Sequence, residues 1–446
     1  MTASLSTVRN DRYILALIDF VALYLALFLA LLIRYDGSFT WNMLSLHAFP
    51  FTVISLFSIL AYYIAGMYER SVVYNLKKVA ARLLNAEIAV ALGAIVFFYL
   101  YNNPSITPKT TLTLYVAFSY IIVFLIRLVY ARLSSIPAPV SAILIANGKE
   151  ADELYSRSIE DGTLGIKFIG RIDPADAELE ERVKEIIRHG NPSMIVIDNG
   201  HPGTAKILPA LYEFIFSSKR FIDVQTLYEE VFERVPLSLV RYEWFLEHAS
   251  AARSQIYNIV RRIVEIIIAF VLAIFTALIA PFVALAIKLE DHGPVFIIQR
   301  RIGKEGKVVL LPKFRSMKSS DGGKWLEAND NRVTRVGYFL RKTRIDELPQ
   351  VFSVLKGDLS LIGPRPDIES LGQYLENQLP FYRIRHLVPP GLSGWAQIKQ
   401  DDPPQSLEEN RLRLSYDFYY VKNRSLILDL AIALRTIAIL LSRKGM

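Results

Sequence analysis

The chain has 446 residues, of which 52% are hydrophobic, a formal net charge of +8 and no cysteine. Its length exceeds one ordinary domain core, and its hydrophobic share exceeds the roughly 45–50% usual in soluble proteins, so we expect a membrane protein of several domains. The lack of cysteine excludes disulfides, thiolate metal sites and cysteine catalysis, whereas the net charge suits nucleic acid, an anionic membrane face or phosphorylated substrates.

Four apolar stretches near the N-terminus are each about 20 residues long, which is enough to cross the hydrocarbon core of a bilayer. We expect them to form four transmembrane helices that pack as a bundle within residues 1–135. Asp19 lies inside the first stretch. Because a carboxylate is costly in hydrocarbon, its side chain is expected to face the bundle interior or the headgroup boundary. The stretches are residues 13–33, 46–67, 83–101 and 112–130.

Basic residues near the ends of these stretches set the expected orientation. Short connections rich in Lys and Arg stay in the cytoplasm, so the N-terminus and everything after residue 132 are expected on that side. The residues that indicate this orientation are Arg9, Arg12, Arg70, Lys77, Lys78, Arg82, Arg127 and Arg132.

Residues 138–248 have the pattern of a small parallel α/β domain, because short β-rich runs alternate with polar helical stretches. The turn at Gly148 stands where a Rossmann-like fold places a glycine-rich phosphate loop, but it contains a single glycine. Since close approach to a pyrophosphate normally needs more glycines, we favour a structural or regulatory role over nucleotide binding. The expected strands are residues 140–146, 166–171, 194–197 and 221–224.

Residues 263–289 have the length and hydrophobicity of a fifth transmembrane helix. Pro281 lacks a backbone donor and clashes with the preceding turn, so the helix is expected to bend there. A full crossing would leave the basic C-terminal region outside, with no later span to return it. We therefore expect a re-entrant helix that breaks at Pro281 and dips into the inner leaflet, and a kinked crossing is the alternative.

The C-terminal domain, residues 256–446, carries the candidate chemistry. Lys and Arg outnumber Asp and Glu after residue 290, and this surplus accounts for the net charge of +8. Gly-Pro pairs mark sharply turned loops between short helices, which predicts a mainly helical domain. The apolar pattern of residues 426–441 is interrupted by Asp429 and Arg435, which favours an amphipathic interfacial helix over a span.

An adjacent acidic pair, Asp346-Glu347, stands between Arg341, Arg344 and Arg365. Two carboxylates among cations suit an anionic substrate held by arginines, with a carboxylate that attacks phosphorus or holds a divalent metal. Acidic residues also stabilise a helix N-terminus, and this structural role is compatible with catalysis. Adjacent residues on a helix point about 100° apart, so we expect one carboxylate to attack and the other to assist.

Four blocks of this region resemble the bacterial polyprenyl-phosphate hexose-1-phosphate transferases, which are monotopic phosphoglycosyl transferases. The four-helix and α/β front end is similar to the long form of that family, which initiates exopolysaccharide and O-antigen synthesis. One departure is Ala280, because the family pattern has a serine before the proline. The blocks are KFRSM from Lys313, Arg341 followed by DELPQ from Asp346, GDLSLIGPRP from Gly357, and PGLSGWAQ from Pro390.

The resemblance implies a two-step reaction at the cytoplasmic face of the bacterial inner membrane. A nucleotide diphosphate sugar, in this family a UDP-sugar, gives its phosphosugar to an aspartate and releases nucleoside monophosphate. Polyprenyl (undecaprenyl) phosphate then accepts the phosphosugar. By the same resemblance, Asp346 is the nucleophile, Glu347 supports Mg²⁺ or proton handling, and both are Mg²⁺ ligands. The residues expected to bind substrate phosphates are Arg341, Arg365, Lys313, Arg315 and Arg344.

Two other functions stay open at this point. A membrane-anchored nucleotide-sugar dehydratase or epimerase can share the front end, but it needs a second dinucleotide domain, and residues 291–446 contain no G-x-G-x-x-G loop. A non-catalytic scaffold for polysaccharide assembly is the other, although a scaffold has no need of an acidic pair among cations. The expected partners are the two substrates, membrane lipid and a second copy of the chain, with no nucleic acid.

Some residues have a structural interpretation of equal or greater weight. Arg344, Arg383 and Arg385 also suit surface positions beside anionic lipid headgroups. His386, like His292, is interpreted as structural. Trp395 suits either the core or the membrane interface, where an indole keeps its N–H in water, and we favour the core.

Overall fold

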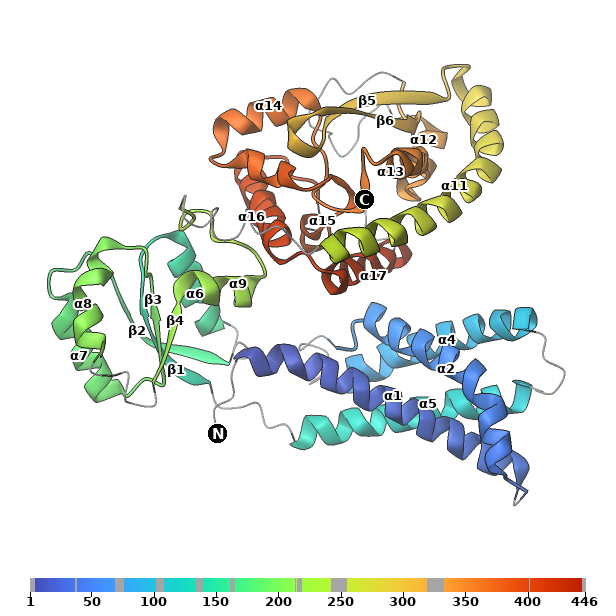
Figure 1. Ribbon diagram of the computed structural model, residues 1–446, viewed down its shortest axis with the longest axis horizontal. Helices are drawn as coiled ribbons and strands as arrows, with labels where there is room; N and C mark the ends of the chain where they lie inside the picture. Colours follow the sequence, from blue (N-terminus) through green and yellow to red (C-terminus); the bar gives the residue numbers. More distant parts are fainter. Residues whose placement is uncertain are drawn as a thin grey trace. The chain divides into compact units, whose positions relative to one another are not determined.

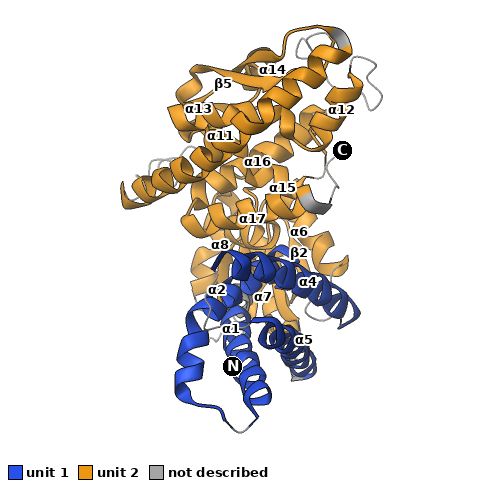
Figure 2. Cartoon of the chain, turned by 90° about the vertical axis from the view of Figure 1, so that its right-hand side faces the viewer, with its two compact units in different colours: residues 1–138 blue, residues 139–446 orange. Residues whose placement is uncertain are grey.

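The computed structural model describes residues 5–36, 38–68, 76–101, 108–133, 139–160, 165–212, 214, 219–241, 255–318, 333–400 and 402–442. The chain divides into two compact units, Met1–Ala138 and Pro139–Met446, which Figure 2 colours separately. The expected α/β and C-terminal domains both belong to the second unit, and the three-domain division stays an interpretation. Arg70 lies outside the described residues, as do the side chains of Arg9 and Arg12.

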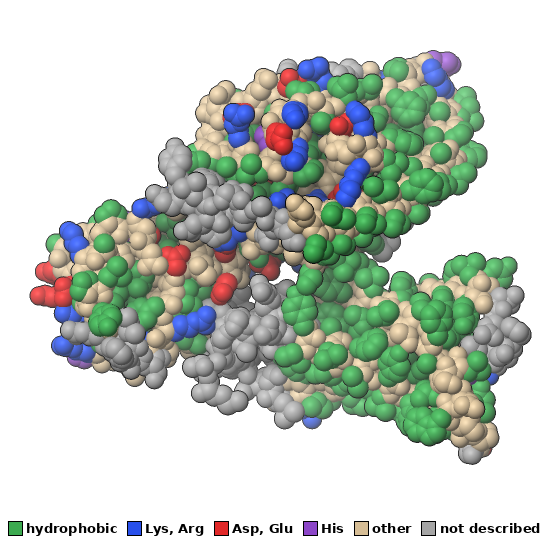
Figure 3. Space-filling model, in the orientation of Figure 1, with side chains coloured by type: hydrophobic (Ala, Val, Ile, Leu, Met, Phe, Trp, Pro, Cys, Tyr) green, Lys and Arg blue, Asp and Glu red, His purple; other side chains and the backbone are tan. Residues whose placement is uncertain are grey.

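The described part of the first unit is built from four long apolar helices (Figure 1). Each contains a segment long and apolar enough to cross a membrane, so the four predicted helices are confirmed. Apolar side chains cover much of the visible surface of this unit (Figure 3), as lipid contact requires. The helices are α1 (Leu5–Tyr35), α2 (Trp41–Ile64), α4 (Leu76–Tyr101) and α5 (Pro108–Leu133).

Asp19 of α1 and Arg127 of α5 form a buried ion pair inside this bundle, with Arg127 Nη2 2.5 Å from Asp19 Oδ2. Tyr68 donates a hydrogen bond to the same carboxylate oxygen at 2.9 Å. The inward orientation predicted for Asp19 is confirmed. Arg127, interpreted above as a cation of a cytoplasmic connection, is instead buried, because the intramembrane carboxylate needs a counter-charge. The expected orientation stays a prediction from the other basic residues.

The second unit begins with a four-stranded parallel sheet of order β2-β1-β3-β4. Helices α7 and α8 cover one face, where apolar side chains pack on β1, β2 and β3 (Figure 1); those buried there are Leu179, Val183, Ile187, Ile207 and Leu211. The predicted strands are confirmed to within a residue at each end. Gly148 has a φ of 97°, and its N–H donates a hydrogen bond to Asn147 Oδ1. A side chain of the turn itself therefore satisfies this backbone donor. The elements are β1 (Val140–Ile145), α6 (Lys149–Glu160), β2 (Ile166–Ile172), α7 (Leu179–Gly190), β3 (Met194–Ile197), α8 (Pro202–Tyr212), β4 (Arg220–Asp223) and α9 (Val224–Phe232).

The C-terminal part is mainly helical, as predicted, and contains two small two-stranded sheets, antiparallel β5-β6 and parallel β7-β8. Short helices and sharp turns connect these strands, in agreement with the Gly-Pro pattern. The elements are α11 (Gln255–Asp291), β5 (Phe296–Ile302), η1 (Lys304–Gly306), β6 (Val308–Phe314), α12 (Arg335–Lys342), η2 (Ile345–Gln350), α13 (Val351–Lys356), β7 (Ser360–Ile362), α14 (Glu369–Gln378), η3 (Tyr382–Leu387), β8 (Gly391–Ser393), α15 (Trp395–Lys399), α16 (Leu407–Asn423) and α17 (Leu426–Ser442).

Helix α11 is one continuous helix of 37 residues that contains Pro281. Figure 1 shows that its course bends rather than stops, so the structure has a bent helix where the sequence predicted two helices separated by a break. A proline removes only one helical hydrogen bond, and the flanking turns keep the helix going. The helix includes a fifth segment of membrane-spanning length and hydrophobicity. Its re-entrant placement stays a prediction.

The N-terminal end of α11 is anchored by partly buried polar contacts within the C-terminal part. Arg262 donates from Nη1 to Val354 O and from Nη2 to Leu355 O, both at 2.8 Å, which satisfies carbonyls at the end of α13. Tyr257 donates to Asp429 Oδ2 of α17 at 2.8 Å. Asp429 therefore faces the protein interior, and α11 and α17 are held together at this end.

Candidate active site

The acidic pair lies in the first turn of η2, a six-residue 3₁₀ helix that follows α12 directly. Arg344 precedes it with a left-handed backbone, φ 58°, which turns the chain sharply between the two helices. The predicted position of the pair at a helix N-terminus is therefore found. Pro349 lies within the same short helix, where the N–H that proline lacks removes few backbone hydrogen bonds.

Glu347 is surrounded by cations from two other elements. Its Oε1 accepts a hydrogen bond from Lys313 Nζ at 2.8 Å and one from Arg365 Nη2 at 2.7 Å. Lys313 comes from β6 and Arg365 from the loop after β7. Burial alone would raise the pKa of the Glu347 carboxyl, but the charges of Arg365 and Lys313 outweigh burial and hold it well below its usual range. Glu347 is thus a fixed anion.

Asp346 has the opposite surroundings, although it is the neighbouring residue. Its side chain is buried, and Oδ1 has no hydrogen-bond partner among the residues that the structure describes. Burial, followed by the charge of Glu347, raises the pKa of the Asp346 carboxyl. A buried carboxylate oxygen without a donor is costly and chemically available. The two carboxylates therefore have different surroundings, and the expected division of roles between them stays a prediction.

Three of the predicted cations act on Asp346 through their charge. The positive charges of Lys313, Arg344 and Arg341 oppose the rise in its pKa, which places all three in its electrostatic environment. Arg341 Nη1 lies 3.4 Å from the sulfur of Met317, whose carbonyl accepts a hydrogen bond from Arg315 Nε at 3.1 Å. Arg315 and Arg341 thus meet at Met317.

Apolar packing under the site fixes η2 relative to α11. Ile345, the residue before Asp346, packs with Phe314 of β6 and Leu340 of α12. Val283 and Ile287 of α11 belong to the same cluster, which also includes Ala280. Pro281 therefore lies in the part of α11 that supports the acidic pair.

Two glycines of the sequence blocks allow β7 and β8 to approach each other. A Cβ on Gly391 would lie 2.1 Å from the backbone N of Gly363, and one on Gly363 would lie 2.4 Å from Pro389 O. The N–H of Gly363 donates to Ser393 O at 2.8 Å. Close pairing of these backbones sets the start of the loop that carries Arg365.

A buried charge cluster behind this loop was not identified from the sequence. Arg385 and Arg413 both contact Asp367, Arg385 also pairs with Asp417 at 2.8 Å, and Tyr382 donates to Asp367. The interpretation of Arg385 as a surface cation is wrong, because the side chain is 1% exposed and satisfies these carboxylates. Arg383 is exposed and pairs with Glu376.

Burial and the neighbouring charge of Arg385 lower the pKa of His386 to about 4, so the imidazole is neutral at pH 7, in line with a structural role. Trp395 is buried as predicted. Its Nε1 donates to Glu233 O at 2.8 Å, which ties the end of α9 to the last sequence block.

Whether the candidate site can hold Mg²⁺ depends on the carboxylates of Asp346 and Glu347. Within the described ranges, no group of three or more His, Asp and Glu side chains is placed to hold a metal. Asp346 offers a buried carboxylate oxygen to which no described residue donates, however, and Mg²⁺ is usually held by one or two carboxylates together with substrate phosphates and water. Asp346 and Glu347 therefore fit a Mg²⁺ ion that a substrate diphosphate would help to bind.

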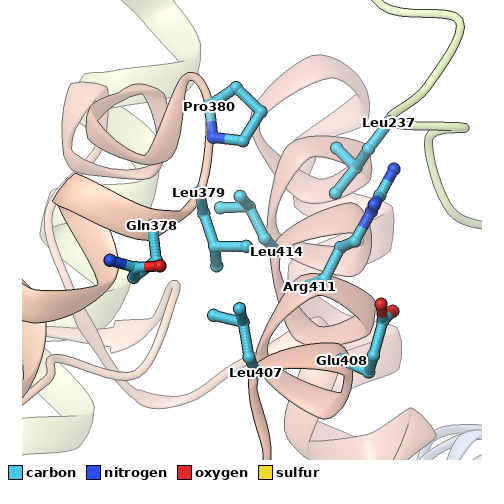
Figure 4. Close-up of a pocket in the computed structure, with 8 residues that line it drawn as sticks. All are labelled: Leu237, Gln378, Leu379, Pro380, Leu407, Glu408, Arg411 and Leu414. Atoms are coloured by element: carbon cyan, nitrogen blue, oxygen red, sulfur yellow. The ribbon is translucent and has the colours of Figure 1, made fainter.

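A separate cavity of about 110 Å³ lies between the segment after α9, the end of α14 and α16 (Figure 4). Leu237, Leu379, Leu407 and Leu414 line it, with Arg411 and Glu408 at one side. None of the predicted site residues contributes to this lining, so the cavity is not part of the candidate active site.

Comparison with known proteins identifies the family of the C-terminal part of the chain. The sequence model described as bacterial sugar transferase matches residues 256–443, which include the acidic pair and every predicted phosphate-binding residue. The chain is 40% identical over 189 residues to a UDP-glucose:undecaprenyl-phosphate glucose-1-phosphate transferase of Caulobacter vibrioides, which is 41% of this chain and 70% of that relative. The protein belongs to the bacterial sugar transferase family.

Two further relatives carry related names. A UDP-N-acetylgalactosamine-undecaprenyl-phosphate N-acetylgalactosaminephosphotransferase of Aeromonas hydrophila is 43% identical over 196 residues, 43% of this chain and 46% of the relative. A UDP-glucose:undecaprenyl-phosphate glucose-1-phosphate transferase of Escherichia coli is 36% identical over 188 residues, 41% and 40% respectively. The match spans less than half the length of these two proteins. The family resemblance is confirmed for the C-terminal part, and the likeness of the front end to the long form stays a prediction.

Proposed function

We propose that this protein transfers a sugar 1-phosphate from a nucleotide diphosphate sugar to polyprenyl phosphate, through a phosphosugar bound to Asp346. The observation that carries the proposal is the asymmetry of the acidic pair. Glu347 is held by Lys313 and Arg365, whereas Asp346 keeps a buried oxygen that has no donor among the described residues. A carboxylate attacks a polyanion only if nearby cations offset the repulsion, and the cations around this pair meet that condition.

The reaction has two displacements at one phosphorus. An oxygen of Asp346 attacks the phosphorus that carries the sugar, the bond from this phosphorus to the bridging oxygen breaks, and nucleoside monophosphate leaves. An oxygen of polyprenyl phosphate then attacks the same phosphorus, the bond to Asp346 breaks, and the carboxylate is restored. The product is a sugar linked to the lipid by a diphosphate.

The cations have separate tasks in this scheme. Arg365 and Lys313 sit on Glu347 and stabilise the negative charge that develops on the leaving phosphate. Arg341, Arg344 and Arg315 bind outer phosphate oxygens, for which a planar guanidinium is better suited than an ammonium. A Mg²⁺ ion held by oxygens of Asp346 and Glu347 would supply further charge neutralisation at the diphosphate.

The names of the relatives narrow the substrates. Each names a UDP-linked sugar as donor and undecaprenyl phosphate as acceptor, and we propose the same two classes here. We place the site at the cytoplasmic face of the bacterial inner membrane, where the acceptor headgroup and soluble nucleotide sugars meet. The chain would then initiate the synthesis of a polysaccharide on its lipid carrier.

Purified protein in detergent would be incubated with Mg²⁺, undecaprenyl phosphate and a panel of nucleotide diphosphate sugars, while nucleoside monophosphate is measured. Asp346→Asn is compared with Asp152→Asn, the same change at an exposed carboxylate that pairs with Arg171 on the α/β domain. The proposal expects monophosphate release from one donor, abolished in Asp346→Asn and retained in the control. Release of nucleoside diphosphate would indicate direct glycosyl transfer and overturn it.

A further inference from the structure

The loop that carries Arg365 is held at three consecutive backbone carbonyls. Each accepts a hydrogen bond from a residue of another element, two of them from arginine side chains. Contacts with other elements therefore hold the backbone at Arg365, and the prolines on either side of it, Pro364 and Pro366, restrict it further. The bonds run from Arg385 Nη2 to Arg365 O at 2.8 Å, from Arg301 Nη1 to Pro366 O at 2.7 Å, and from Ile302 N to Asp367 O at 3.0 Å.

Arg385 is itself held by the buried charge cluster. Its guanidinium pairs with Asp367, two residues after Arg365, and with Asp417 of α16 at 2.8 Å. All three side chains are at most 4% exposed. Arg413 supplies the second positive charge and donates a hydrogen bond from Nη2 to Asp367 Oδ2 at 2.8 Å. Two acids and two arginines thus form a cluster without net charge. The guanidinium group of Arg385 also donates a hydrogen bond to the loop, at Arg365 O.

The far end of the same chain of contacts is the acidic pair. Arg365 donates from Nη2 to Glu347 Oε1 at 2.7 Å. Arg385 lies behind Arg365, on its backbone side, and makes no contact with Asp346 or Glu347 in the described structure. Whatever Arg385 contributes to the site therefore acts through Arg365.

We propose that Arg385, together with Arg301, is a positioning residue that sets the Arg365 guanidinium for the substrate diphosphate and for Glu347. This inference rests on the proposed function. A side chain as long as arginine has many rotamers, and its tip follows any movement of its own backbone. A misplacement of about 1 Å can cost on the order of 100-fold in rate, so clamping the backbone of a phosphate-binding arginine has a direct effect on turnover.

The test is a pair of matched arginine-to-lysine variants. Arg385→Lys keeps a cation beside Asp367 and Asp417, but one ammonium cannot bind both carboxylates and the Arg365 carbonyl with the geometry of a guanidinium. Arg413→Lys makes the same change in the same cluster without touching the Arg365 backbone. We expect kcat/KM for the sugar donor to fall about 10- to 100-fold in Arg385→Lys and less than threefold in Arg413→Lys, at similar melting temperatures.

Combination with Arg365→Lys distinguishes positioning from a general loss of structure. If Arg385 acts through Arg365, then Arg385→Lys added to Arg365→Lys lowers kcat/KM by less than twofold further, because the group to be positioned is already changed. Arg413→Lys, by contrast, has the same proportional effect in both backgrounds. Losses from Arg385→Lys and Arg365→Lys that simply multiply would overturn the inference, as would wild-type kcat/KM in Arg385→Lys.

Arg301→Lys repeats the test at the neighbouring carbonyl if Arg385→Lys does not fold, and the same non-additivity with Arg365→Lys is required of it. Wild-type protein run in the same assay separates the two proposals. An inactive but folded wild type contradicts the proposed function and the inference that rests on it. An active wild type with insensitive Arg385 and Arg301 variants refutes only the positioning role.

Discussion

Arg365 donates a hydrogen bond to Glu347 Oε1 at 2.7 Å, and this contact decides which carboxylate of the adjacent pair stays available. With Lys313 on the same oxygen, Glu347 is an ion-paired anion that is difficult to protonate or displace. Asp346, one residue earlier, is buried beside that fixed charge, and one of its oxygens has no donor in the part of the chain that the structure describes. The 3₁₀ helix separates the two side chains enough to give neighbours in sequence opposite environments.

Loss of charge at the two carboxylates should change stability in opposite directions. Glu347→Gln leaves the partly buried Lys313 and Arg365 without their common anion, which should lower the free energy of unfolding by about 2–4 kcal/mol. Asp346→Asn removes a repelled, buried charge and should leave stability equal or higher. Thermal unfolding of both variants in the same detergent checks this, and a lower melting temperature for Asp346→Asn than for Glu347→Gln would contradict it.

A methyl group on Gly391 should separate β7 from β8. Because its Cβ would meet the backbone of Gly363 and not a flexible side chain, Gly391→Ala is expected to cost about 3 kcal/mol or more and to reduce turnover by displacing the Arg365 loop. Gly170→Ala is the matched control, since its Cβ meets only the end of the Ile186 side chain. Melting temperatures of the two variants are compared, and equal values would show that the close pairing is not required.

The order of helices and strands could be predicted from the sequence, because each element depends on a local pattern of apolar and polar residues. Apolar stretches of membrane-spanning length predicted the four bundle helices, and alternating β-rich runs predicted the ends of β1 to β4 to within a residue. The acidic pair and its cations were also predicted, from spacing and from the resemblance of four short blocks. Their roles stay predictions. The structure shows that Glu347 contacts Lys313 and Arg365, and the order of the blocks does not show which carboxylate binds these cations.

The charge cluster behind the loop could not be predicted in the same way. Asp367 lies in the loop after β7, Arg385 in η3, and Arg413 and Asp417 in α16, and in one sequence each looks like an ordinary surface charge. Only the tertiary fold shows that they neutralise one another when buried. Arg127 was misinterpreted for the same reason, because its partner Asp19 lies on a helix 108 residues away.

His386 should make the protein sensitive to mild acid. Burial and the charge of Arg385, with a smaller contribution from Arg383 and against the opposing charge of Asp367, lower its pKa from 6.5 to about 4. The unfolded chain therefore binds a proton more readily, so the stability contribution of neutral His386 is present above pH 6.5 and is lost as pH falls toward 4. The pKa difference corresponds to about 3 kcal/mol at most.

The corresponding measurement is the melting temperature of wild type and His386→Gln between pH 7 and pH 4. The wild-type curve should fall more steeply below pH 6.5 than that of the variant, which has no imidazole to protonate. Parallel curves would mean that other groups account for the acid sensitivity.

In the bundle, the Asp19–Arg127 pair should behave as a unit. Asp19→Asn leaves a buried guanidinium without a counter-charge, and Arg127→Gln leaves the carboxylate with only Tyr68, so each single change is expected to destabilise the bundle by about 3 kcal/mol. The double variant removes both charges and should recover most of that loss, since two amides can hydrogen-bond in the same space. Thermal unfolding in detergent of the two single variants and the double variant gives the coupling energy. Additive losses would show that the two charges are stabilised independently, for instance by water inside the bundle.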